Sequence, residues 1–248
     1  MDDALYVQHD LLEEDHWWFV GRRRIVVSVL RSLVARDDRD RQILDVGCGT
    51  GGMLKALRTF GGVTGMDTSH FAIDRARERS GCRVEWGVLP EPTPFEPGSF
   101  DVVTALDVIE HVDDDEEAVR TIHRVLRPGG LFVCTVPAFR FLWSGHDEVN
   151  HHRRRYRRTE LRRKLVGAGF RIRRLTYFNF LLFPPIALIR LVGRLSGRKG
   201  SDFEVPFRGI NGMLAGIFGA ERYLLGVTSL PFGVSLLAVC EKLPPSAT

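Results

Sequence analysis

Residues 43–52, which read ILDVGCGTGG, constrain the fold more than any other part of this 248-residue chain. The first half of the stretch is apolar and suits a buried parallel strand, whereas the glycines that follow cannot continue one. Helical spacing resumes between Met53 and Leu57. Glycine takes positive φ and lacks a Cβ, so a ligand can approach the backbone, and the new helix presents unpaired N–H groups to it. The stretch predicts a strand, a glycine turn and a helix that hold an adenosine-bearing cofactor.

Two cofactor classes fit such a turn. Gly47, Gly49 and Gly52 match the dinucleotide pattern GxGxxG, so an NAD-dependent oxidoreductase is an alternative, as is a turn with no ligand. Asp45 stands two residues before the first glycine, and with it the stretch closely resembles motif I of the class I S-adenosylmethionine-dependent methyltransferases. This resemblance implies S-adenosylmethionine as cofactor and S-adenosylhomocysteine as product. It also implies cofactor contacts from Asp45, Gly47, Cys48, Gly49 and Gly51.

A second predicted strand, residues 61–67, ends in the carboxylate of Asp67. A nucleotide-binding fold places the acid that accepts the ribose hydroxyls about 20 residues beyond the turn, which is where Asp67 lies. We expect Asp67 and the adjacent Thr68 to contact the cofactor. Related methyltransferases commonly carry an acid after the third strand, where this chain has Val88. That departure leaves the backbone of Gly87 and Val88 as the expected adenine contact.

Two later segments extend the resemblance. Residues 99–112 predict a fourth strand and a helix start in the family pattern FDVV…EHV, and residues 123–137 (HRVLRPGGLFVCTVP) predict a helix end and a fifth strand. An open α/β sheet binds its ligand at the carboxyl ends of its strands, so Leu106, Asp107 and His111 are expected near the reactive sulfonium. His111 is a candidate for catalysis as well as for cofactor contact, although a histidine at such a place also packs and hydrogen-bonds.

The N-terminal region predicts one or two helices between residues 11 and 33 that form a lid. Two adjacent tryptophans on a helix cannot both face a core, so one of them is expected to cover something else. The pattern HWWF…RR resembles the lid of many bacterial members of the family, which lies over the cofactor. Trp17 and Arg22 are therefore cofactor-contact candidates; plain packing and a solvated arginine face are the alternative.

The segment 139–156 is too long for a simple connector and rich in ionisable groups, so we expect an active-site loop. It resembles the HDE…H.RRY segment of some bacterial relatives. The general-base candidates are His146, Asp147, His152 and Tyr156. Asp147 has an alternative role, which is to pair with an arginine and hold the loop closed.

From residue 153 to 174 the chain carries eleven basic residues and one acid, Glu160. Such a face could attract a phosphate, a carboxylate or anionic lipid. It also keeps an RNA methyltransferase as an alternative, although a pI near 9.1 is only a footprint and no nucleic-acid-binding motif accompanies it. We therefore expect no nucleic-acid partner.

Residues 180–192 form the most apolar run, interrupted by two prolines and Arg190. A spanning helix needs about 20 apolar residues, so this run does not cross a membrane. An amphipathic segment with Arg190, Arg194, Arg198 and Lys199 on one side could lie on a bilayer surface or roof the pocket of a greasy substrate, and core packing is the third reading.

The four cysteines are widely spaced, with no CxxC pair and no zinc spacing, so we expect buried free thiols and no metal. The acidic N-terminus lacks the order of a signal peptide, which favours a cytoplasmic location, with peripheral membrane contact as an addition.

Together these patterns predict one α/β domain: a Rossmann-like, seven-stranded, mostly parallel sheet with helices on both faces and an antiparallel last strand. We expect a lid (1–40), a cofactor-binding half (41–137) and a substrate-binding half (138–248) whose helical cap is inserted at about 179–230. The implied activity is methyl transfer to an oxygen, nitrogen or carbon of a small molecule, lipid-like or glycosylated, by a monomer or homodimer. A non-catalytic cofactor-binding interaction protein is the alternative outside enzymology.

Overall fold

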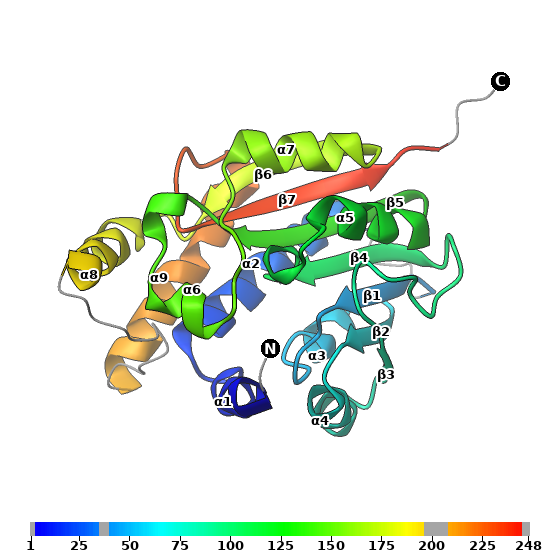
Figure 1. Ribbon diagram of the computed structural model, residues 1–248, viewed down its shortest axis with the longest axis horizontal. Coiled ribbons are helices and arrows are strands. Elements are labelled where there is room, and N and C mark those ends of the chain that lie inside the picture. The colour runs from blue at the N-terminus through cyan, green and yellow to red at the C-terminus, as the bar shows by residue number, and fades with distance from the viewer. Residues whose placement is uncertain (1–2, 35–39, 196–207, 245–248) are drawn as a thin grey trace.

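The computed structural model describes residues 3–34, 40–195 and 208–244. Its centre is a seven-stranded sheet with the order β3-β2-β1-β4-β5-β7-β6, shown in Figure 1. The first five strands are parallel to one another, and β7 runs antiparallel between β5 and β6. The predicted fold class is confirmed. The strands are β1 (Gln42–Val46), β2 (Gly62–Asp67), β3 (Arg83–Trp86), β4 (Phe100–Leu106), β5 (Leu126–Pro137), β6 (Phe170–Phe178) and β7 (Ser235–Lys242).

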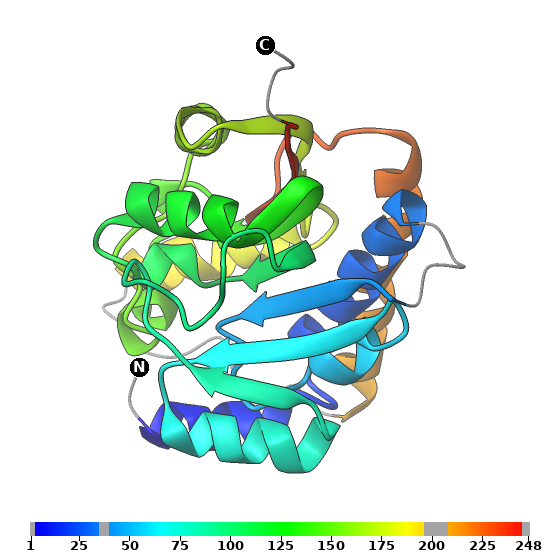
Figure 2. The same cartoon turned by 90° about the vertical axis from the view of Figure 1, so that its right-hand side faces the viewer.

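Helices cover both faces of the sheet (Figures 1 and 2). On one side lie α2, α3, α4 and α9, and on the other α5 and α7, while α1, α6 and α8 surround one end. The helices are α1 (Asp3–Leu12), α2 (Trp17–Leu33), α3 (Leu54–Leu57), α4 (His70–Ser80), α5 (Asp115–Val125), α6 (Gly145–Val149), α7 (Arg158–Gly167), α8 (Phe183–Leu195) and α9 (Arg208–Val227), with the 3₁₀ turns η1 (Ile109–His111) and η2 (Arg140–Leu142).

Local sequence signals explain most element boundaries. The side chain of Ser69 accepts a hydrogen bond from the Ala72 amide and caps α4, and Gly81 ends that helix in the left-handed conformation. The N-terminal prediction was wrong in its start: a separate helix, α1, begins at Asp3. The prediction missed it because α1 is short and buries only a few of its side chains, which leaves a weak apolar periodicity.

The lid and the cap pack directly on each other through α2 and α9. A Cβ at Gly21 of α2 would lie 2.2 Å from Phe218 Cδ1, so the glycine permits this close approach. Trp18 stacks on Phe218, with ring centroids 5.2 Å apart. Trp17 is buried and Trp18 is half-buried, and both contact Phe218 of α9. Both also line the cavity described below, so they cover more than the core, as expected of at least one of them. The division into lid, cofactor half and substrate half remains a prediction.

All four cysteines are free and buried, as predicted. Within the described residues, none of the helices is both long and apolar enough to cross a membrane. The basic residues Arg198 and Lys199 lie outside the described residues.

Candidate functional site

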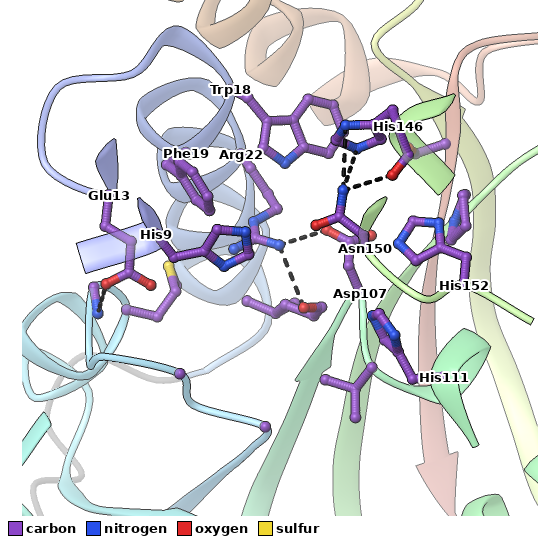
Figure 3. Close-up of a pocket in the computed structure, with 18 of the residues that line it drawn as sticks. His9, Glu13, Trp18, Phe19, Arg22, Asp107, His111, His146, Asn150 and His152 are labelled. Atoms are coloured by element: carbon purple, nitrogen blue, oxygen red, sulfur yellow. Dashed lines mark hydrogen bonds and ion pairs between the residues drawn. The ribbon is translucent and has the colours of Figure 1, made fainter. Parts of the chain in front are cut away.

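A cavity of about 760 Å³ opens at the carboxyl ends of β1, β2, β4 and β5 (Figure 3). The lid, the glycine turn and the loop 139–156 all contribute to its wall. It therefore joins the predicted cofactor-binding and substrate-binding halves. The predicted site residues that line it are Trp17, Arg22, Asp45, Gly47, Cys48, Gly49, Asp67, Thr68, Gly87, Val88, Leu106, His111, His146 and His152.

Three predicted site residues are absent from that lining: Gly51, Asp147 and Tyr156. Gly51 has φ +92°, and a Cβ there would lie 2.9 Å from the Ala76 Cα, so the structure explains this glycine by the packing of the turn on α4. The other two support residues that do line the cavity, as described below.

The glycine turn presents its backbone to the cavity. Gly47 and Gly49 both have positive φ, at +65° and +54°. The amides of Gly47 and Cys48 donate to the Met66 carbonyl, at 2.7 and 3.1 Å, which fixes the turn against β2. A Cβ added at Gly49 would meet only Glu13 Oε1, 3.5 Å away. The absent side chain thus leaves room beside the backbone, as close approach of a ligand requires.

Asp67 is the most heavily hydrogen-bonded carboxylate of the turn region. Its Oδ2 accepts the Gly49 amide at 2.8 Å, and its Oδ1 accepts the amides of Thr68 and Ser69 at 2.8 and 3.1 Å. The Tyr6 hydroxyl also donates to Oδ1, at 2.8 Å. These bonds hold the carboxylate in the cavity wall at the end of β2.

Asp45 is buried at the end of β1 and accepts a 2.6 Å hydrogen bond from the Thr104 hydroxyl. Burial raises the pKa of the Asp45 carboxyl to about 7, although the Thr104 bond opposes the shift.

The sequence prediction missed the contribution of α1. Tyr6 and His9 of α1, and Glu13 just after it, are spaced at i, i+3 and i+7, and all three line the cavity. Figure 3 shows His9 and Glu13 there. Glu13 Oε2 accepts hydrogen bonds from the Thr50 hydroxyl and the Gly52 amide, at 2.6 and 3.0 Å. That spacing is the signal of one helical face and could have revealed the role of α1.

Arg22 reaches into the cavity from α2. Its guanidinium contacts the Asp107 carboxylate at 2.5 Å and donates to the Leu106 carbonyl at 3.3 Å (Figure 3). Asp107 has φ +58°, a conformation that is rare for a residue other than glycine. The end of β4 thus presents a strained backbone and an ion pair where the sequence places the sulfonium.

On the substrate side, His152 Nδ1 lies 2.8 Å from Asp147 Oδ1. The fully buried Asp147 also accepts from Arg155, at 2.7 and 2.9 Å. Burial alone would raise its pKa, but the bonds from His152 and Arg155 prevail and hold the pKa of Asp147 well below its usual range. The carboxylate is therefore ionised, orients the His152 ring, and pairs with an arginine as the alternative reading anticipated.

Tyr156 is fully buried away from the cavity lining, and its hydroxyl donates to Asp115 Oδ2 at 2.6 Å. Burial and that carboxylate raise the pKa of the phenol. A buried phenol held by an acid in this way stabilises the fold and is poorly placed to accept a proton from a ligand.

His111 and His152 meet edge to face, with ring centroids 4.8 Å apart. Behind them lies Glu110, which is completely buried and has neither carboxylate oxygen hydrogen-bonded within the described residues. Burial, and then the neighbouring His152, lower the pKa of His111 to about 3, so that imidazole is neutral near pH 7. One ligand atom from each of the three residues lies within 4.8 Å of the others, a donor set that also suits a divalent cation.

The far wall of the cavity is apolar and comes largely from α8 and the residues before it. Arg190 is 9% exposed and donates to the Leu142 carbonyl at 3.3 Å. The helix turns Arg190 inward to the cavity wall, which agrees with the alternative that this segment roofs a pocket. The apolar side chains of α8 and its flank that line the cavity are Leu182, Pro185, Ile186 and Ile189.

Acids from other elements partly neutralise the predicted basic face. Arg154 and Lys164 pair with Asp115, at 3.2 and 2.8 Å, and Arg173 pairs with Glu241 at 3.0 Å. The sequence count missed these acids because they lie on α5 and β7, outside the segment counted. The face is accordingly less positive than predicted.

Comparison with known proteins agrees with this geometry. A family model described as a methyltransferase domain matches residues 44–134. The chain is 37% identical over 103 residues to the ubiquinone biosynthesis O-methyltransferase of Pseudomonas aeruginosa, covering 39% of this chain and 44% of that protein. It is 30% identical over 169 residues to the malonyl-[acyl-carrier protein] O-methyltransferase of Enterobacter lignolyticus, covering 65% of this chain and 63% of that one. The chain thus matches less than two thirds of the length of these curated relatives.

Among solved structures, a chain in the complex that contains the Haloferax volcanii Trm112 methyltransferase activator has a TM-score of 0.66 at 21% identity. The match covers 99% of this chain and 97% of that chain. The fold is an α/β fold with a cavity at the carboxyl edge of its sheet, which is where open α/β sheets bind their ligands. Over residues 44–134 the chain matches the methyltransferase domain family, and its fold is similar to that of solved S-adenosylmethionine-dependent methyltransferases.

Proposed function

We propose that the protein binds S-adenosylmethionine in the cavity and transfers its methyl group to a small molecule. One observation carries the proposal: a single cavity brings the glycine turn and Asp67 together with an imidazole oriented by a buried carboxylate. A cofactor-binding protein without turnover has no need of the second group.

The cofactor residues fit the proposed ligand. Asp67 would accept the ribose hydroxyls, the open backbone at Gly49 would lie under the amino-acid end, and Arg22 would exchange Asp107 for the ligand carboxylate. Gly87 and Val88 line the same cavity beside Asp67, where an adenine would lie. The bound sulfonium supplies an activated methyl group.

Because the donor is activated, the protein has two tasks, which are to position the acceptor and to remove its proton. Orientation contributes about 7–11 kcal/mol to such reactions, and a general base about 10²–10⁴-fold in rate. His152 is the proposed base. With Nδ1–H donating to Asp147, Nε2 is left with a lone pair to accept the proton. Of the other candidates, His146 and His111 line the cavity as its neighbours, whereas Asp147 and Tyr156 act as supporting residues.

The test of this role compares His152→Ala with wild type and with His151→Ala, its exposed neighbour. The assay follows S-adenosylhomocysteine released from S-adenosylmethionine with a panel of phenolic, acyl and glycosylated acceptors. We expect His152→Ala to lose about 10²–10⁴-fold in kcat with unchanged affinity for S-adenosylhomocysteine, and His151→Ala to retain activity. Equal turnover by both variants would remove His152 from the mechanism.

We also propose an acceptor with an apolar body that the protein takes from a lipid surface. On α8, the side chains of Leu188, Ile189, Leu191 and Val192 are 53–67% exposed, and Ile189 also lines the cavity. A helix that exposes apolar side chains and borders the cavity suits contact with a bilayer. The guanidinium of Arg190 in the cavity wall favours an anionic or glycosyl part on the acceptor.

Vesicle flotation tests the surface contact. We expect binding to phosphatidylglycerol vesicles by wild type and loss of binding by Leu191→Glu, with Val166→Glu, on the exposed side of α7, as control. Binding that is unchanged in Leu191→Glu would refute the contact. The proposed setting is the cytoplasmic side of a membrane.

A further inference from the structure

Asn179, between β6 and α8, is a polar residue whose side chain the fold does not use. It is 0% exposed and forms part of the cavity wall. Neither its Oδ1 nor its Nδ2 has a hydrogen-bond partner among the residues that the structure describes. A buried amide without partners costs about 1–3 kcal/mol. The side chain therefore works against stability as the chain stands, which calls for an explanation other than folding.

The backbone around Asn179, by contrast, is firmly held. Asn179 has φ +55°, in the left-handed region. Glu221 of α9 accepts the Leu181 amide at 2.8 Å, and the Val234 amide donates to the Asn179 carbonyl at 3.3 Å. A Cβ at Gly233 would lie 2.3 Å from the Phe178 carbonyl oxygen, so the lead into β7 presses closely on this turn. The fold thus fixes the position of Asn179 through its main chain, while its side-chain amide makes no hydrogen bond within the described residues.

The location of Asn179 assigns it to the acceptor end of the cavity. In the sheet order, β6 stands four strands from β1 and five from β2, which carries Asp67. At about 4.8 Å per strand, these separations are about 19 and 24 Å. The groups expected to bind the nucleoside thus lie at the opposite end of the sheet.

An aromatic surface adjoins this end. Trp18 lines the cavity, and its ring lies 6.1 Å from that of Phe178, the residue before Asn179. Phe218 stacks behind Trp18, which fixes the indole in place. A rigid indole favours contact with a planar ring.

We propose that Asn179 and Trp18 form an acceptor subsite for a planar ring that bears a neutral group able both to donate and to accept a hydrogen bond, such as a hydroxyl. An amide offers a donor and an acceptor side by side, so a hydroxyl satisfies both where a carboxylate or an ammonium satisfies one. The inference rests on the proposed function, since it names the substrate class of the same cavity. It makes Asn179 a specificity-determining residue rather than a structural one.

The experiment uses phenol and benzene as probes of the S-adenosylhomocysteine-loaded protein, with affinities from ligand-observed NMR. The variant is Asn179→Gly, because glycine keeps the positive φ while removing the amide. We expect phenol affinity to fall about five- to tenfold, as loss of the amide bonds predicts, with benzene and S-adenosylhomocysteine affinities unchanged. Since the amide makes no bond in the fold, Tm should fall by no more than about 4 °C, the backbone entropy cost of one glycine.

Equal phenol affinity in both proteins, or phenol binding to neither, would overturn the proposal. So would a much larger fall in Tm, because it would show a structural role for the amide. If wild type fails to bind S-adenosylhomocysteine, the proposed function fails by itself, and the phenol comparison on the unloaded protein still decides the role of Asn179.

Discussion

Removing the Asp67 carboxylate tests the proposed cofactor site most directly. The two oxygens of this carboxylate are used unequally: Oδ2 accepts only the Gly49 amide, whereas Oδ1 accepts the Thr68 and Ser69 amides and the Tyr6 hydroxyl. The amides belong to the turn and to the start of α4, and they stay in place when a ligand binds. A ribose that donates two hydroxyls can therefore use the free lone pair of Oδ2, and its second hydroxyl must displace Tyr6 from Oδ1.

The number of hydrogen bonds gained and lost sets the expected loss of affinity in Asp67→Ala. Two new bonds replace one, so the net gain is about one hydrogen bond to a charged group, or roughly 1.5–3 kcal/mol. We therefore expect Asp67→Ala to weaken S-adenosylhomocysteine binding by about 10- to 150-fold. The figure is smaller than two full bonds would give, because Tyr6 competes for the same oxygen. For the same reason, Tyr6→Phe should bind at least as tightly as wild type.

Calorimetric titration of wild type, Asp67→Ala and Tyr6→Phe with S-adenosylmethionine, S-adenosylhomocysteine and NADH measures these effects. Asp74→Ala is the matched control, since that acid lies on α4 with a side chain 79% exposed. Thermal unfolding of each variant separates lost binding from lost structure. Asp67→Ala that binds like wild type would refute the argument. If the protein bound NADH and neither of the other two ligands, the glycine turn would be a dinucleotide site.

Three further predictions concern stability and metals. Burial raises the pKa of Glu221 to about 7, so the folded state retains a proton that the unfolded state loses above about pH 4.5. The free energy of unfolding therefore falls as the pH rises from 4.5 toward 7. Urea unfolding should show Glu221→Gln to be more stable than wild type by about 3 kcal/mol at pH 8 but not at pH 4.5. Gly21→Ala should lower the free energy of unfolding by about 1–3 kcal/mol, because the new methyl group would collide with Phe218. Gly216→Ala has open space around it and should raise the free energy of unfolding by about 0.5–1 kcal/mol. If Gly21→Ala were the more stable variant, the α2–α9 packing would be contradicted. A chelator should leave turnover unchanged if His152 is the base. Loss of activity with EDTA and its recovery with Zn²⁺ or Mn²⁺ would instead make Glu110, His111 and His152 metal ligands.

The local motifs carried most of the information about the cofactor half. Asp45, Gly47, Gly49 and Asp67 could be placed from sequence because a strand, a tight turn and a helix follow each other within a few residues, and the parallel sheet then fixes where their ends meet. Gly51 shows the limit of that inference. It belongs to the same motif, yet its lack of a Cβ serves the packing of Ala76, a contact with a helix more than 20 residues away.

The substrate half depends on long-range contacts and was harder to predict. Asp147, His152 and Tyr156 stand within ten residues, and sequence alone ranked them together as bases. Only the folded chain separates them, because Tyr156 meets Asp115 on α5 whereas Asp147 meets Arg155 and His152. The net charge of the basic segment 153–174 was also hard to predict, because the acids that neutralise it come from α5 and β7.

The sequence by itself determined the fold class, the strand, glycine turn and helix around residues 43–57, and the place of Asp67 at the end of the second strand, because each depends on local periodicity or on residues close together in the chain. The tertiary structure decided which polar side chains face the cavity. It brought α1 over the turn, turned Arg190 inward, and left the amide of Asn179 without a partner. These outcomes depend on how elements far apart in the chain pack together. The residues next to a side chain in the sequence do not show which distant residues it contacts.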